Sequence, residues 1–190
     1  MEKLLSEIRR CSICEPFLKD GVRPVLRANA KARIAVIGQA PGSKVHKTGI
    51  PWDDPSGIRL REWLDVSPKQ FYDEEVFAII PMGFCYPGKG KSGDLPPRPE
   101  CAPKWHSELF DRLPNIELTL LIGSYAQKYY LRESTKKTLT ETVRGYQDYL
   151  PEYIPLPHPS PRNNIWLRKN GWFEDQVIPI LRERTKALIL

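Results

Sequence analysis

Four cysteines have the most distinctive spacing in this sequence. Cys11 and Cys14 form a Cys-x-x-Cys pair, and Cys85 and Cys101 follow much later in the chain. Four thiolates that converge on one site suit an iron–sulfur cluster or a structural zinc ion. A Cys-x-x-Cys pair by itself is also found as a redox pair. The residues alone leave these alternatives open.

A histidine between prolines is the second group that could do chemistry. His158 lies between Pro157 and Pro159, and Ser160 and Pro161 follow. Proline restricts both its own backbone and that of the residue before it, so this imidazole is held in place. A restrained imidazole can donate a hydrogen bond to negative charge that develops on a leaving group. A lone histidine of this kind more often just caps a turn.

The third candidate is the turn at residues 38–42. Ile34 to Ile37 is a short apolar run rich in β-branched residues, which predicts a buried parallel strand. Gly-Gln-Ala-Pro-Gly follows it, and two glycines allow the backbone to approach a ligand closely. Ligands of open α/β sheets bind just beyond the carboxyl ends of the strands.

The elements that must position these groups alternate between strands and helices. This alternation predicts an α/β fold, a three-layer α/β/α sandwich around a mainly parallel four-stranded sheet, in a single domain over residues 1–190. The predicted strands are 34–37, 76–80, 118–122 and 153–156. The predicted helices are 1–10, 57–64, 102–113, 125–131, 138–149 and 171–190. The segments 15–31, 43–56 and 81–103 are predicted loops.

Composition gives weaker guidance. The net charge is +6 and the pI about 9.1, which suits an acidic partner such as nucleic acid and equally suits a basic solvated surface. No apolar run is long enough for a membrane helix, and the N-terminus lacks a secretory pattern. We therefore expect a cytoplasmic protein without a membrane partner, and a monomer. In that compartment the cysteines are expected to be thiols or metal ligands rather than disulfides.

Together the motifs resemble a known family. The turn Gly38 to Gly42 and the segment His158 to Asn163 resemble the two signature motifs of the uracil-DNA glycosylase superfamily. Gly49-Ile50-Pro51-Trp52 resembles the stretch whose aromatic ring stacks on the flipped base, and Gly123 to Ala126 resembles the turn between the motifs. The resemblance implies a monofunctional DNA repair glycosylase that everts a deaminated base, with uracil as the first expectation, and hydrolyses its N-glycosidic bond.

The resemblance also implies roles for individual residues. His158 would stabilise the departing base, and Gln39 or Asp53 would position water. Trp52 would stack on the base. Base-binding residues would be Gly38, Ala40, Pro41, Gly42, Trp52 and Met82. Ser160, Arg162 and Asn163 would bind backbone phosphates.

The cysteine spacing resembles the iron–sulfur branch of the superfamily, known as family 4. There a 4Fe-4S cluster joins the N-terminal segment to the loop after the second strand. The resemblance implies that Cys11, Cys14, Cys85 and Cys101 hold such a cluster in a structural role, with structural zinc as the alternative.

Two positions depart from the family pattern. Family 4 members usually carry Glu where this chain has Gln39, and an amide can orient water but cannot take its proton. Asp53 and Asp54 are candidates to replace that acid, with His46 a weaker one, although Asp54 is also suited to cap the helix that follows.

The second departure concerns base choice. The family reads uracil with an Asn at the position of Pro81, whose side chain has neither donor nor acceptor. Another deaminated base, or reading by backbone groups of Met82 and Phe84, is therefore an open alternative. A nucleic-acid-binding module that keeps the fold without the chemistry is the main rival function. A nucleotide-binding α/β protein is a weaker one.

Overall fold

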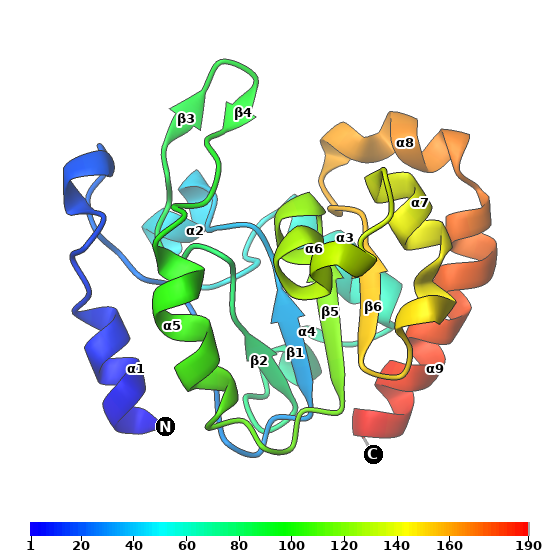
Figure 1. The fold of residues 1–190 in the computed structure, drawn as a ribbon, viewed down its shortest axis with the longest axis horizontal. Coiled ribbons are helices and arrows are strands. Elements are labelled where there is room, and N and C mark those ends of the chain that lie inside the picture. The colour runs from blue at the N-terminus through cyan, green and yellow to red at the C-terminus, as the bar shows by residue number, and fades with distance from the viewer. Residues whose placement is uncertain (190) are drawn as a thin grey trace.

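A computed structural model describes residues 1–189 as a central parallel sheet covered by helices on both faces (Figure 1). The sheet has four strands in the order β2-β1-β5-β6. Their bounds are β1 Ile34–Ile37, β2 Phe77–Ile79, β5 Leu118–Ile122 and β6 Tyr153–Leu156. All three strand pairings are parallel, so the carboxyl ends of all four strands lie along one edge of the sheet. The predicted fold class is confirmed.

Alternating side chains of the strands build two hydrophobic cores. Ala35 and Ile37 of β1 face one core, which helices α1, α5 and α6 cover. Ile34 and Val36 face the other, which α3, α9 and the turns beside them cover. This alternation follows from the two-residue period of a strand, and it is why β1 is apolar at every position.

The two edge strands of the sheet differ in what lies on their outer side. β6 is an edge strand, which tolerates Pro155 because its outer side needs no ladder hydrogen bond. The outer side of β2 is covered by the loop that precedes β1, where Arg27 and Ile79 exchange backbone hydrogen bonds of 3.0 and 2.7 Å.

The helices agree with most of the predicted spans. Their bounds are α1 Glu2–Arg9, α2 Ser43–Thr48, α3 Pro55–Leu64, α4 Pro68–Phe71, α5 Cys101–Phe110, α6 Ser124–Leu131, α7 Leu139–Arg144, α8 Asn164–Lys169 and α9 Ile178–Ile189. No helix in the described part of the chain has the length and apolar character that crossing a membrane requires.

Several predicted boundaries were wrong. The predicted loop 43–56 contains α2, which ends where Gly49 adopts a left-handed conformation. The predicted helix 138–149 breaks at Gly145 into α7 and a 3₁₀ turn. The predicted helix 171–190 starts as a π-helical turn, Phe173–Val177, before α9, and its last residue lies outside the described residues.

The long loop 81–103 contains a small hairpin that the sequence did not predict. Its two strands are β3 Lys89–Gly90 and β4 Gly93–Asp94, paired antiparallel. The hairpin projects beyond the edge of the sheet at which the parallel strands end (Figure 1).

Candidate active site

A pocket lies at the carboxyl end of β1, and we call it the β1 pocket. Its lining combines the turn after β1, the segment before α3 and the loop after β6. The lining residues are Val25, Gly38, Gln39, Ala40, Pro41, Gly42, Val45, Pro51, Trp52, Asp54, Ile79, Pro81 and His158. Parallel strands bring these loops to one edge, so residues far apart in sequence share one site.

Trp52 is held in this pocket by close backbone packing. Its ring lies against Gly38, where a Cβ would come within 2.8 Å of Trp52 Cζ2. Trp52 has a positive φ of 58°, a left-handed conformation that is rare for a large side chain. Behind it, a Cβ on Gly57 would lie 1.8 Å from the Trp52 carbonyl oxygen, so only glycine fits there. The indole is therefore fixed in place before any ligand binds.

His158 faces the same pocket with a defined tautomer. The Ser160 backbone N–H donates to His158 Nδ1 over 3.2 Å, so in the neutral ring the proton lies on Nε2. Asn163 Nδ2 donates to the His158 carbonyl over 2.7 Å. Arg59 Nη1 on α3 donates to the carbonyls of Pro159 and Ser160 over 3.4 and 3.2 Å. The loop that carries the imidazole is thus held by hydrogen bonds from Asn163 within the loop and from Arg59 on α3.

The electrostatic surroundings keep this ring neutral. Burial lowers the pKa of His158, and the charges of Asp54 and Asp94 oppose that effect only in part. The imidazole ring centre lies 5.6 Å from that of Trp52. A neutral imidazole with a fixed Nε2–H can donate a hydrogen bond next to an aromatic platform.

The structure separates the two adjacent aspartates. Asp54 lines the β1 pocket and also caps α3, because its Oδ1 accepts the Gly57 N–H over 2.8 Å. Asp53 is not among the residues that line the pocket, and it forms an ion pair with Lys44 at 3.5 Å. Gln39 lines the pocket, and its Nε2 donates to the Leu95 carbonyl over 3.3 Å. The carboxylate at the pocket is therefore that of Asp54.

The backbone after β2 is already engaged in hydrogen bonds. Pro81 lines the β1 pocket, but its carbonyl lies 3.1 Å from His106 Nε2. The Met82 N–H donates to the Gly38 carbonyl over 2.8 Å, and the Phe84 N–H donates to Cys101 Sγ over 3.3 Å. Met82 is not among the lining residues. These two N–H groups hold the loop together and are not free to read a base.

The expected phosphate-binding residues lie on the turn directly after His158. Ser160 Oγ accepts the Arg162 N–H over 3.2 Å and starts a 3₁₀ turn, Pro161–Asn163. Arg162 is exposed, and its guanidinium lies against Gly93 of the β3–β4 hairpin, where a Cβ would come within 2.5 Å of Nη1. Ser160 and Arg162 can offer donors to an anion, whereas the amide of Asn163 is used to hold the loop.

All four cysteines line a second cavity, which we call the cysteine cavity. The other residues around it are Leu18, Val22, Pro24, Gly83, Phe84 and Arg98. None of the four forms a disulfide. Burial, with a smaller contribution from the neighbouring cysteines, raises the pKa of Cys85 to about 11 and that of Cys101 to about 12. Thiolates gathered in such an apolar place need a cationic partner.

The arrangement of the four cysteine thiols limits which metal ion or cluster they could bind. Within residues 1–189, no group of three or more Cys, His, Asp and Glu side chains is placed to hold a metal ion. A tetrahedral zinc site requires four ligands about 2.3 Å from one ion. Four cysteines are also the ligand set of a 4Fe-4S cluster. The four thiols around one cavity therefore supply the complete donor set of either group.

Comparison with known proteins agrees with the geometry of the β1 pocket. A sequence model of the Uracil DNA glycosylase superfamily matches residues 27–182, which is most of the chain. This chain belongs to the uracil DNA glycosylase superfamily. It is similar to the type-4 uracil-DNA glycosylase of Thermotoga maritima, with 24% identity over 163 residues that cover 84% of this chain and 81% of that protein. As a superfamily member the protein is a DNA glycosylase, a hydrolase of N-glycosidic bonds.

Some residues around this glycosylase site had no local signal in the sequence. Arg59 is one charge on an amphipathic helix, yet it clamps the loop of His158. His106 on α5 holds the Pro81 carbonyl and lies 2.7 Å from the Tyr130 hydroxyl through Nδ1. Asp54 was a candidate acid in the sequence, but nothing there distinguished it from Asp53. The contacts of Arg59 and His106 join residues that are far apart in the sequence, so no local sequence pattern predicts them.

Proposed function

We propose that this protein excises uracil from DNA after the base is everted into the β1 pocket. The observation that supports this most is the meeting of the 38–42 turn, Trp52 and His158 in one pocket. Extrusion of a base costs a few kcal/mol, and stacking on an aromatic ring recovers roughly 1–3 kcal/mol of it. The fixed indole of Trp52 offers that platform.

The bond-breaking step uses His158. The bond between the sugar C1′ and N1 of uracil breaks, and the electron pair leaves with the base as an anion. The Nε2–H of His158 donates a hydrogen bond to the oxygen on which this charge develops. Because the ring is neutral and fixed in its loop, it needs no rearrangement as the charge forms.

Water completes the reaction at C1′. In our proposal Asp54 takes the place of the acid missing at Gln39, while the Gln39 amide orients the water. The oxygen of water bonds to C1′ and its proton passes to the Asp54 carboxylate. The sequence indicates Asp53 as well as Asp54, but the ion pair of Asp53 with Lys44 and its place outside the pocket lining favour Asp54.

The two roles of Asp54 can be separated by substitution. Asn caps a helix as well as Asp does, so Asp54→Asn keeps the cap and removes the charge. We expect excision to slow by about 100-fold with an unchanged melting temperature. Asp53→Asn is the matched control and should retain activity. Equal losses for the two variants would contradict the assignment.

We further propose that the four cysteines hold a 4Fe-4S cluster. When bound, it would join the segment that carries Cys11 and Cys14 to the loop that carries Cys85 and Cys101. The hydrolysis itself transfers no electron, so this role is structural.

A base-excision panel tests the function. Single- and double-stranded oligonucleotides carry one uracil, hypoxanthine or xanthine, and alkali cleaves the strand at any abasic site. We expect cleavage with uracil. Cleavage only with another deaminated base would overturn the choice of substrate, and binding without cleavage would favour a module that has lost its chemistry.

A further inference from the structure

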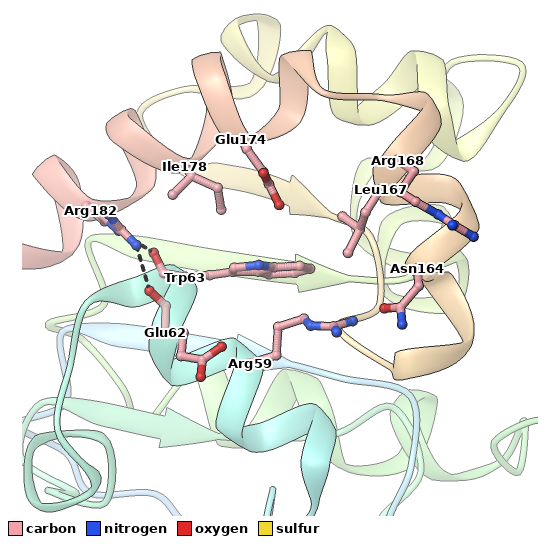
Figure 2. Close-up of a pocket in the computed structure, with 9 residues that line it drawn as sticks. All are labelled: Arg59, Glu62, Trp63, Asn164, Leu167, Arg168, Glu174, Ile178 and Arg182. Atoms are coloured by element: carbon pink, nitrogen blue, oxygen red, sulfur yellow. Dashed lines mark hydrogen bonds between the residues drawn. The ribbon is translucent and has the colours of Figure 1, made fainter.

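A second, larger groove lies behind the loop of His158, between α3 and the helices α8 and α9 (Figure 2). Its lining is mostly charged. The charged lining residues are Arg59, Glu62, Arg168, Glu174 and Arg182. We call it the arginine groove. None of its residues lines the β1 pocket.

The three arginines are not neutralised by the two glutamates. Among residues 1–189, no ion pair joins Arg59, Arg168 or Arg182 to Glu62 or Glu174. Three arginines against two glutamates leave the lining with a net charge of +1 (3 − 2).

Hydrogen bonds fix two of the guanidiniums. Arg182 donates to the carbonyls of Glu62 and Trp63 over 2.9 and 3.3 Å, and Arg59 donates to the loop after His158. Arg168 is exposed, and within the described residues it has no hydrogen bond or ion pair. Its fork of N–H donors is therefore available to a ligand.

Two of the three arginines lie at the same end of the groove. Figure 2 shows the guanidinium of Arg59 extending toward Asn164, with Arg168 at the same end, while Glu62 lies at the opposite end beside Arg182. The basic end is where the chain enters α8, directly after the Pro161–Asn163 turn. An anion would thus be favoured next to the loop of His158.

We propose that this end of the arginine groove binds a backbone phosphate of the DNA strand that flanks the everted base. The inference rests on the proposed function and on the expectation that Ser160 and Arg162 bind backbone phosphates. The same chain segment continues from those residues to Asn164 and Arg168, so a strand that leaves the loop meets the groove next. A planar guanidinium is suited to a phosphate because it can donate two parallel hydrogen bonds.

The test measures DNA affinity as a function of salt. Undamaged duplex is titrated with the wild-type protein, with Arg168→Ala and with Lys169→Ala. Lys169 is the neighbouring exposed cation and does not line the groove, so it matches the loss of net charge. Each phosphate contact contributes about 0.9 to the slope of log K against log salt. Arg168→Ala should lower the slope by about one and weaken binding roughly eightfold at 0.1 M salt.

The remaining variants define the outcomes. Lys169→Ala should change the slope by much less. Arg168→Lys keeps the positive charge, so it should retain most of the salt dependence that Arg168→Ala loses. Equal slopes for Arg168→Ala and Lys169→Ala would overturn the proposal. Because undamaged DNA is used, this readout is independent of excision. A protein that excises nothing but shows the Arg168 effect would refute the proposed function alone.

Discussion

The β1 pocket and the cysteine cavity are built by opposite means. In the β1 pocket the chain fixes its own functional groups. Trp52 packs closely against Gly38 and Gly57, and the Ser160 N–H donates to the ring of His158. In the cysteine cavity four thiols line a space whose burial raises the pKa values of Cys85 and Cys101. The side chains of the β1 pocket are held in position by the protein itself. The cysteines of the second cavity instead need a cationic group to bind.

This difference indicates where each kind of damage should appear. Substitutions in the β1 pocket that spare its hydrogen bonds should affect the reaction while leaving the fold intact. Substitutions in the cysteine cavity should affect stability, because a group that binds only the folded chain stabilises it.

The largest expected effect is that of His158→Ala. Removing one donor to a developing oxyanion typically costs about 100- to 1000-fold in rate. We expect that loss in single-turnover excision of uracil, with the iron content unchanged. A variant that retained the wild-type rate would show that His158 does not stabilise the leaving base.

Cys101→Ser should affect stability first. We expect iron and sulfide to be lost from protein purified without oxygen. A ligand at 100 times its Kd adds about 3 kcal/mol, so its loss should lower Tm by roughly 5–10 °C in a chain of this size. Metal analysis and thermal melting measure both. Wild-type protein that contained stoichiometric zinc and no iron would favour the alternative metal.

Gly57→Ala tests how rigidly the β1 pocket is built. The new Cβ would lie 1.8 Å from the Trp52 carbonyl oxygen, so the segment before α3 must shift. We expect a loss of about 3 kcal/mol in the free energy of unfolding together with slower excision. Gly171→Ala is the control, because nothing lies within 4 Å of its Cβ position. A tolerated Gly57→Ala would mean that Trp52 is not fixed in this way.

The effect that is smallest at neutral pH concerns acid stability. Burial lowers the pKa of His106 from 6.5 to about 4. The unfolded chain therefore binds this proton at a higher pH, so stability present above pH 6.5 is lost as the pH falls toward 4. The loss attributable to His106 is about 3 kcal/mol. Denaturant titrations at several pH values should show a shallower decline for His106→Gln, and an identical decline would contradict this assignment.

The sequence predicted best what depends on local pattern. Apolar runs located all four parallel strands, and Asp54 was correctly expected to cap α3. Short helices such as α4 and α8 were missed because their few residues show no clear periodicity.

Only the site residues that belong to a sequence motif could be predicted. The 38–42 turn, Trp52 and His158 could be named in advance, since glycine, proline and aromatic residues at fixed spacing carry the signal. The choice between Asp53 and Asp54 could not be made from the sequence, because two adjacent aspartates differ only in the direction in which the fold points their side chains. The clamp by Arg59 and the support of Pro81 by His106 join residues distant in the sequence.

The most direct test of the account is a crystal structure with DNA that contains a non-hydrolysable deoxyuridine analogue. We predict that the everted uracil lies in the β1 pocket, stacked on Trp52 and within hydrogen-bond distance of His158 Nε2. A base that stays in the duplex, or that binds outside this pocket, would contradict the central claim.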